Sequence, residues 1–374
     1  MKNEIHRLGD YIREVDVRNK DLKVTNLLGV NLNKQFFPSI ANIIGTDLSK
    51  YKVIKKGQFG CKFMSVGRDG ILPISLLKND EFAIISSAYY AFEVIDDNIL
   101  SSDYLMMWLR RPEFDRQLWF YSGGDVRGGV NYRDFCEMPI IVPSIEQQRE
   151  IVSEYETISK RIKLNEQIIK NLEATAQTLY RKMFVEGIDK ENLPEGWRIG
   201  TLGEIAEIIM GQSPDGETYN LEGDGIIFYQ GRTDFERRFP TARVYTTSPT
   251  RYAKEGDILL SVRAPVGDIN IASHDCCIGR GLASLRAKNE CQSYLYYQLQ
   301  NLSDIFNISD DEGTIFGSIT KDDLHNIGVA IPSKQIIKEF ENMVSAIDNE
   351  IKLKDNELNI LTELQSLLLA KMGQ

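Results

Sequence analysis

Cysteine is scarce in this sequence, and long apolar runs are lacking. The five cysteines form no CxxC pair and have no metal-ligand spacing, which makes a disulfide framework or a zinc ribbon unexpected. No apolar run approaches the roughly 18–20 residues that span a bilayer. The opening residues "MKNEIHRLGD" also lack the apolar core of a signal peptide. We therefore expect a cytoplasmic protein in a reducing compartment, without membrane contact.

The usual signatures of catalysis are also missing. There is no GxxxxGK[ST] phosphate loop and no GxGxxG that follows a strand. His6, His274 and His325 do not form HExxH, and "SHDCC" (273–277) is too tightly spaced for tetrahedral zinc ligation. A methyltransferase or nuclease would need a [DN]PP[YFW] motif or a PD…ExK cluster, and neither is complete here. We expect no catalytic residue and no metal in this chain.

The charge of the chain is unevenly distributed. The 374 residues carry a net charge of −10 and 26% charged side chains, an ordinary globular composition that allows two or more domains. Within residues 226–286, however, nine side chains are basic and six are acidic, and eight of the nine are arginine. Because exposed charges are screened beyond about 8–10 Å, this local excess matters more for a polyanionic partner than the total does.

The chain repeats itself at an offset of 189 residues. "MPIIVPS" (138–144) matches "IGVAIPS" (327–333), and "RIKLN" (161–165) matches "EIKLK" (350–354). Between these matches the two halves diverge, and "EGIDKENLPEGW" (186–197) has the composition of a linker. This pattern predicts a globular domain over 1–142, a helix over 143–186, a second globular domain over 187–331 and a second helix over 332–374.

Two long helices are the clearest local prediction. Ser144 and Gln147 form a capping-box pattern at the first helix start. A 4-3 heptad seam follows, and it recurs in the second helix, which favours a coiled coil of two antiparallel helices. The seam positions are Ile158, Ile162, Asn165, Ile169, Leu172, Ala176, Leu179 and Met183, and then Ile347, Ile351, Lys354, Leu358, Leu361, Gln365, Leu368 and Met372.

The globular halves have more strand signals than helix signals, so the predicted class is α+β with two repeat-related domains and pseudo-twofold symmetry. Two apolar pairs lie outside the seam at repeat-related positions, Leu164 with Leu353 and Tyr180 with Leu369. Apolar side chains outside a seam need another surface to cover them. They either dock a partner protein or pack on the adjacent domains.

Arginine-rich loops are the best candidates for binding. A guanidinium group is a planar fork that bonds guanine O6 and N7 bidentately, which an ammonium group does not. "SVRAPVG" places an arginine at a strand end, and "IGRGL" flanks another with glycines that let the backbone approach a ligand closely. The alternative for each residue is an ordinary solvated or salt-bridged side chain. The candidate DNA-contacting residues are Lys62, Arg68, Arg127, Tyr229, Gln230, Arg232, Arg237, Arg238, Arg263 and Arg280.

The order of domains and helices resembles the specificity subunit of a type I restriction-modification system. "LPEGWRIGTLGEIAEIIMG" (193–211) resembles the opening of a target-recognition domain, and "GDILLSVRAPVGDINIA" with "IGRGLASLRA" resembles its middle. "GSITKDDLHNIGVAIPS" and "GGVNYRDFCEMPIIVPSIEQQREIV" resemble the joints into the two helices. The resemblance covers essentially the whole chain, but "FGCKFMSVGRDGILPISLL" in the first domain follows the pattern only loosely.

The resemblance implies that 1–142 and 187–331 are target-recognition domains, each of which reads one half of a bipartite double-stranded DNA target. The two helices would set the gap between the half-sites and dock two modification subunits, with restriction subunits as further partners. S-adenosylmethionine would then belong to the modification subunits, and ATP and Mg²⁺ to the restriction subunit. This chain itself would hold no cofactor and would be a non-catalytic part of an adenine-N6 methyltransferase complex. The rival interpretation is a non-catalytic repeat scaffold that binds proteins rather than DNA.

Overall fold

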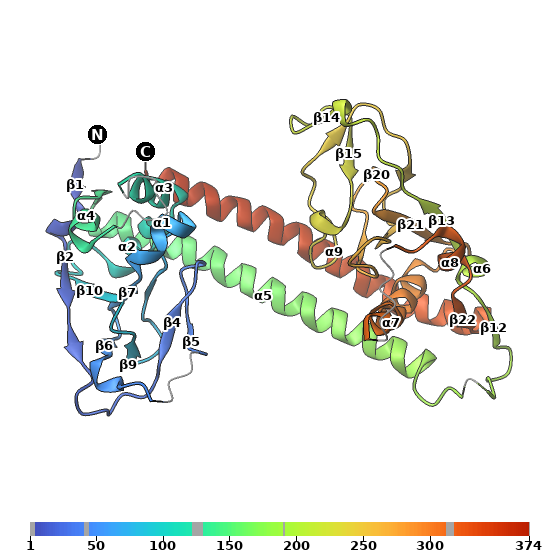
Figure 1. Cartoon of the computed structure of the whole chain (residues 1–374), viewed down its shortest axis with the longest axis horizontal. Coiled ribbons are helices and arrows are strands. Elements are labelled where there is room, and N and C mark those ends of the chain that lie inside the picture. Colours follow the sequence, from blue (N-terminus) through green and yellow to red (C-terminus); the bar gives the residue numbers. More distant parts are fainter. Residues whose placement is uncertain (1–3, 41–44, 122–129, 190, 312–317, 374) are drawn as a thin grey trace. The chain divides into compact units, whose positions relative to one another are not determined.

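The computed structural model describes residues 4–40, 45–121, 130–189, 191–311 and 318–373 (Figure 1). By its internal packing, the chain divides into two compact units. Unit 1 comprises Met1–Asn165 with Asn356–Gln374, and unit 2 comprises Glu166–Asp355. The two long helices, α5 (Ile145–Phe184) and α9 (Lys334–Lys371), each contribute one part to either unit.

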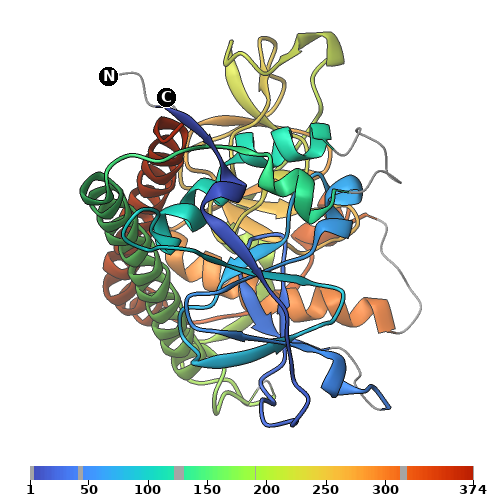
Figure 2. The ribbon, with the colours of Figure 1, turned by 90° about the vertical axis from the view of Figure 1, so that its left-hand side faces the viewer.

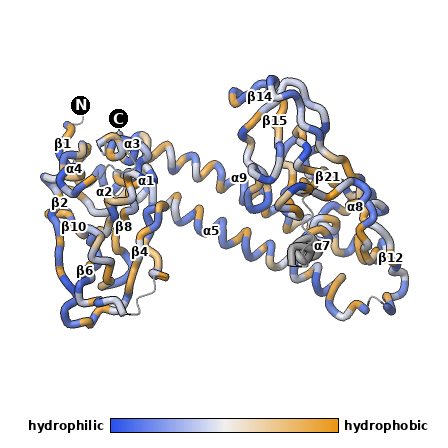
Figure 3. The backbone as a smooth tube through the Cα atoms, in the orientation of Figure 1, coloured by the Kyte–Doolittle hydropathy of each residue, from blue (hydrophilic) through white to orange (hydrophobic). Residues whose placement is uncertain are grey.

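The two predicted long helices are confirmed. Helix α5 has 40 residues and α9 has 38. The N-terminus of α5 is capped as predicted, because Gln147 N donates to Ser144 Oγ (3.4 Å) and Ser144 N donates to Gln147 Oε1 (3.2 Å). Every predicted seam residue is buried or half-buried. Figure 3 shows polar and apolar residues alternating along both helices, as a helix with one apolar stripe requires.

Within each unit, α5 and α9 run antiparallel and side by side (Figure 1, Figure 2). In unit 1, Gln365 Nε2 donates to Ser159 Oγ at 2.8 Å, and Arg161 Nε donates to Glu357 Oε1 at 2.6 Å. In unit 2, the rings of Tyr180 and Phe340 pack edge to face, with centroids 5.8 Å apart. Residues of rising number on α5 therefore meet residues of falling number on α9.

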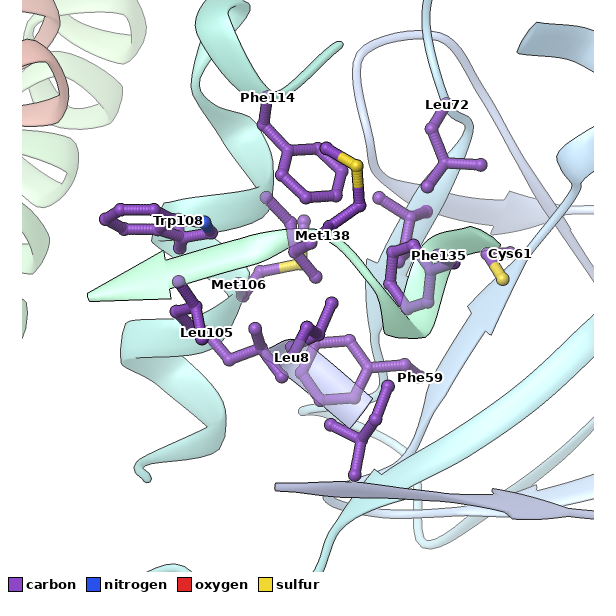
Figure 4. Close-up of a cluster of buried hydrophobic side chains, with 14 of the residues drawn as sticks. Leu8, Phe59, Cys61, Leu72, Leu105, Met106, Trp108, Phe114, Phe135 and Met138 are labelled. Atoms are coloured by element: carbon purple, nitrogen blue, oxygen red, sulfur yellow. The ribbon is translucent and has the colours of Figure 1, made fainter. Parts of the chain in front are cut away.

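A four-stranded antiparallel sheet lies at the centre of unit 1. Its strands, in spatial order, are β2 (Ile12–Val15), β10 (Tyr90–Val94), β7 (Phe59–Cys61) and β8 (Ile74–Leu76). Four helices share one apolar core with this sheet (Figure 4): α1 (Val66–Asp69), α2 (Ser102–Arg110), α3 (Pro112–Tyr121) and α4 (Tyr132–Cys136). Met372 and Leu369, near the end of the chain, pack against the same core.

Smaller elements complete unit 1. The strand pairs and sheets are β1 (Ile5–Arg7) with β11 (Pro139–Ile141), β4 (Leu28–Val30) with β5 (Phe36–Pro38), and β3 (Val17–Arg18) with β6 (Lys52–Lys55) and β9 (Phe82–Ile85). The short 3-10 helices are η1 (Leu8–Asp10), η2 (Leu48–Lys50) and η3 (Phe63–Ser65).

Unit 2 contains a corresponding four-stranded sheet. In spatial order it consists of β13 (Ala206–Met210), β21 (Leu282–Ala287), β18 (Ile258–Ser261) and β19 (Ile269–Ile271). It shares a core with α6 (Leu202–Ile205), α7 (Gln292–Asp311), α8 (Lys321–His325) and the long helices. Strands β12 (Arg198–Thr201) and β22 (Gly328–Ile331) pair beside it.

A five-stranded sheet is the second layer of unit 2. Its order is β14 (Tyr219–Asn220), β16 (Tyr245–Thr246), β15 (Ile226–Tyr229), β20 (Cys276–Ile278) and β17 (Tyr252–Ala253). Short 3-10 helices, η4 (Gly216–Thr218) and η5 (Arg232–Asp234), lie in its connections. Strands β15 and β20 are parallel, so their carboxyl ends meet at the same edge. That edge carries the candidate site.

The repeat is visible in the structure as well as in the sequence. Phe92 of β10 lies opposite Phe59 and Glu14, and Leu285 of β21 lies opposite Ile258 and Ile208, so the two sheets share one register. Helices α4 and α8 both begin with a capping box, at positions 189 residues apart. These features confirm the predicted class, α+β with two repeat-related halves and two long helices. The predicted domain limits at 142, 186 and 331 stay predictions.

Candidate nucleic-acid interface

Four connections of unit 2 meet at the carboxyl ends of β13, β15, β18 and β20. Backbone hydrogen bonds link them in series, from Gln212 N to Ile278 O (3.0 Å), from Gly281 N to Gln230 O (3.2 Å) and from Val262 N to Gly281 O (2.9 Å). We call the exposed side chains at this edge the arginine surface. It consists of Gln230, Arg232, Arg263 and Arg280.

Two glycines allow these connections to approach so closely. A Cβ atom at Gly281 would lie 2.7 Å from the Gln230 carbonyl oxygen, and one at Gly279 would lie 2.9 Å from Gln230 Cα. Both distances are shorter than any side chain tolerates, so only glycine permits this packing. Arg280 stands between the two glycines, and its Nε lies 3.5 Å from Ser213 Oγ. Gln230 and Arg280 are therefore presented next to each other.

Arg263 directly follows the end of β18 and is held by its backbone. It forms an isolated antiparallel bridge with Ser318, and Ile319 N donates to the neighbouring Val262 O at 2.9 Å. Among the described residues, no side chain bonds its guanidinium group. The backbone at Arg263 is therefore fixed before any ligand binds, and only the side chain would lose freedom on binding.

Arg232 lies on the same surface but is paired with a carboxylate. Its Nη1 donates to Asp268 Oδ2, and both side chains are about half exposed. No other described residue bonds Nε or Nη2 of Arg232. Asp268 therefore orients the guanidinium group through one nitrogen, and the other two remain able to donate to an incoming acceptor.

The candidates in unit 1 are less concentrated. Arg68 is exposed, but Asp69 holds its guanidinium group through two hydrogen bonds of 2.8 Å. Lys62 is half-buried and follows β7. By the shared register, the position in unit 1 that matches Arg263 is occupied by the exposed Met64. Arg127 lies outside the described residues. The looser sequence match in the first domain thus corresponds to a different set of exposed side chains.

Comparison with known proteins identifies the family. The model of the type I restriction modification DNA specificity domain matches this chain twice, over residues 39–174 and 194–363. The chain belongs to this family. The two matches place one specificity domain in each half of the repeat, and they confirm the resemblance drawn from the sequence.

Individual relatives agree with the family. A Methanocaldococcus jannaschii protein provisionally named the type I restriction enzyme MjaX specificity subunit is 30% identical over 269 residues, 68% of this chain and 63% of that protein. The present chain therefore spans less than two thirds of the length of this relative. The type I restriction enzyme HindI specificity subunit of Haemophilus influenzae is 21% identical, with 98% of each chain covered. A solved type I restriction-modification S subunit from M. genitalium has the same fold, with a TM-score of 0.65, 17% identity and coverage of 99% and 95%.

Several predicted contacts of the specificity chain lie away from its arginine surface. Tyr229 is buried in the five-stranded sheet, and this burial raises the pKa of its hydroxyl above the ordinary value. Arg238 is 2% exposed and binds Asp348 of α9. Arg237 is exposed but lies near α9, where its charge partly offsets the rise that burial causes in the pKa of Asp355. Tyr229 and Arg238 are therefore too buried to reach a ligand in this structure, and Arg237 lies near α9 rather than on the arginine surface.

The predicted partner-binding residues also separate into two groups. Leu164 of unit 1 and Leu353 of unit 2 are 57% and 63% exposed on the long helices. Tyr180 is buried in unit 2, where its hydroxyl donates to Gln298 Oε1 at 2.7 Å, and Leu369 packs against the unit 1 core. Of the four predicted residues, Leu164 and Leu353 are therefore the two that are open to a partner protein.

Asp268 and Asp348 are the site residues that the sequence reasoning missed, since each acts through an arginine far away in the sequence.

No group of three or more His, Cys, Asp or Glu side chains in the described ranges could hold a metal ion. Burial raises the pKa of Cys276 to about 12, so this thiol stays protonated at neutral pH. None of the helices in the described part of the chain is both long and apolar enough to cross a bilayer.

Proposed function

We propose that this chain is the DNA-reading subunit of a type I restriction-modification complex, and that each half of the repeat reads one half of a bipartite target. The observation that carries this proposal is the arginine surface of unit 2. It brings three arginines and one glutamine, from three separate connections, to one exposed edge of a rigid pair of sheets.

The chemistry of this surface suits the major groove of DNA. Guanidinium groups pair bidentately with guanine O6 and N7, and a glutamine amide pairs with adenine N6 and N7. Arg263 and Arg280 have solvent-facing side chains. The backbone is fixed by the bridge to Ser318 at Arg263 and by the two flanking glycines at Arg280, and Asp268 orients Arg232. We infer that Gln230 and these three arginines divide base reading and phosphate positioning among them.

The long helices would serve as spacer and docking platform. Two repeat-related domains on stiff helices suit two half-sites that lie one or two DNA turns apart, at about 34 Å per turn. A flexible linker would hold the domains at this distance less well. Leu164 and Leu353 occupy repeat-related positions, so we propose that each docks one modification subunit. Those subunits would supply S-adenosylmethionine and methylate adenine N6, while this chain contributes recognition only.

Methylome sequencing tests the proposal. A methylation-free host would express this chain together with its neighbouring modification subunit. We expect one bipartite motif that carries N6-methyladenine, and replacement of residues 187–331 by those of a homologue should change one half of it. If the assembled complex methylates no motif, the proposal fails and a protein-binding scaffold becomes the better interpretation.

A further inference from the structure

Arg238 is the largest charged side chain that unit 2 buries completely. Its Nη2 donates to Asp348 Oδ1 of α9 at 2.6 Å, and its Nη1 lies 3.3 Å from the Tyr297 hydroxyl. That hydroxyl donates to the same Asp348 oxygen at 3.0 Å, which closes a triangle of hydrogen bonds. The guanidinium group also lies over the Tyr296 ring, 4.4 Å from its centroid. Arg238 is thus fixed in distance and in orientation.

The segment that carries Arg238 is the one that carries Gln230 and Arg232. Between them, Asn270 of β19 bonds the chain at Glu236 in both directions, because Glu236 N donates to Asn270 Oδ1 (3.2 Å) and Asn270 Nδ2 donates to Glu236 O (3.0 Å). Ile271 N donates to Arg238 O at 2.8 Å. The strand that makes these bonds is preceded by Asp268, the partner of Arg232.

These contacts form one continuous path from α9 to the arginine surface. It runs from Asp348 to Arg238, through β19 to Asp268, and from there to Arg232. Within β19 the path follows the backbone, and each step between separate segments is a hydrogen bond or an ion pair within unit 2. An apolar side chain in place of Arg238 would bury the 230–238 segment equally well. It would not fix the orientation of the segment, because apolar packing is not directional. Buried ion pairs give little net stability, and their best-attested role is to specify one arrangement.

We propose that Arg238 is a positioning residue for sequence reading: it anchors the 230–238 segment to α9 so that Gln230 and Arg232 are presented at fixed places. This inference rests on the proposed function, because it concerns how the same surface is held. It does not require Arg238 to touch DNA. It links the accuracy of one half-site to a contact on the long helix.

The test separates positioning from stability. The double variant Arg238→Met with Asp348→Leu replaces the ion pair by apolar groups, a change that often leaves stability unaltered or improved. Tyr297→Phe is a milder variant that removes only the hydroxyl of the triangle. Arg238→Lys keeps the positive charge but removes the planar guanidinium group. Glu255→Gln is the matched control, because it breaks the exposed ion pair of Glu255 with Lys352 on the same helix.

Each variant would be assembled with the modification subunits, and methylation would be measured on duplexes that differ by one base in either half-site. We expect the double variant to lose about tenfold in discrimination, a typical value of one base contact, at the half-site read by residues 187–331 alone. Tyr297→Phe should lose less discrimination than the double variant, and Arg238→Lys should retain part of it. Glu255→Gln should lose no discrimination.

Melting temperature would be recorded for every variant. The inference is overturned if the folded double variant and Tyr297→Phe both discriminate between the duplexes as well as the wild type does. It is also overturned if methylation falls equally on all duplexes and follows the loss of stability. If the wild-type complex itself fails to distinguish the duplexes, the proposed function fails instead, so the two failures are distinguishable.

Discussion

Arg286 and Asp257 form a bidentate ion pair across β21 and the start of β18, with Nε–Oδ1 and Nη2–Oδ2 distances of 2.7 and 2.8 Å. The Asp257 side chain is buried and also accepts from Ser284 Oγ and Lys254 N. Arg286 therefore has a structural role, whereas Arg263 and Arg280 from the same stretch face solvent. Arginines of one motif thus divide between holding the sheet and forming its surface.

Asp257→Ala should destabilise the protein, because four donor atoms of Arg286, Ser284 and Lys254 lose their acceptor at once. Water can solvate the 37% exposed Arg286 side chain, so the main cost comes from the buried Ser284 hydroxyl left without its acceptor, about 1–3 kcal/mol in the free energy of unfolding. Urea denaturation would measure this loss. Asp69→Ala removes the partner of the exposed Arg68 and serves as the control, for which we expect no measurable change. Equal stability of the two variants would contradict the structural role of Arg286.

Arg263→Ala should weaken DNA binding by about 1–3 kcal/mol and relax specificity at one half-site, if its guanidinium group reads a base. Fluorescence anisotropy of the assembled complex on matched duplexes would measure both effects. Arg243→Ala is the control, because Asp234 bonds that guanidinium group at 2.9 Å within its own loop. A loss that is equal on every sequence would mark Arg263 as a phosphate contact, and no loss would remove it from the interface.

Leu164→Glu and Leu353→Glu should each weaken the docking of one modification subunit. A carboxylate placed in an apolar contact costs more than the contact contributes. Light scattering after size-exclusion chromatography would count the bound subunits, and we expect one to be lost from each single variant. Asn359→Glu adds the same charge at another exposed position of α9 and should leave the count unchanged. Retention of both subunits in the leucine variants would locate docking elsewhere.

Met372→Ala should destabilise unit 1 by about 2–5 kcal/mol, the usual cost of truncating a buried methionine. Met372 is 7% exposed and packs in the same core as Tyr155 and Trp108. Leu367→Ala, at a position that is 59% exposed on the same helix, should change stability by no more than about 0.5 kcal/mol. Similar losses from both would mean that the end of α9 is not part of the core.

Glu173→Gln should stabilise the protein at neutral pH. Burial raises the pKa of Glu173 above its ordinary value despite the positive charges of Arg238 and Arg237, so ionisation of Glu173 opposes folding. This cost is present above the raised pKa and disappears as the pH falls below the ordinary value of about 4.3. Thermal unfolding at pH 7 and pH 4 would therefore show an advantage of the variant at pH 7 that is lost at pH 4. An advantage that does not change with pH would contradict the assignment.

Periodic features were predictable from the sequence, and pairwise ones were not. The heptad seam and the Ser144 cap predicted α5 and α9 because both depend on spacing along the chain. The glycines around Arg280 predicted close backbone approach to a ligand, which stays a prediction, and in the structure they admit the backbone of Gln230. In contrast, "ERR" gives no sign that Arg237 is exposed and Arg238 buried, because the difference depends on Asp348, which lies 110 residues later. Of the two roles that the sequence left open for Tyr180, the structure shows packing on the adjacent domain, where helix α7 covers the face that a single helix pattern leaves open.

The packing of Met372 and Leu369 into unit 1 has a consequence for synthesis on the ribosome. Unit 2 contains no residue after Asp355, so all of its residues are synthesised before Met372 is. Unit 1 begins first, but its core gains its last side chains only when residue 372 has emerged. The half that is made first is thus the half that finishes folding last, and until then it exposes apolar surface that chaperones recognise.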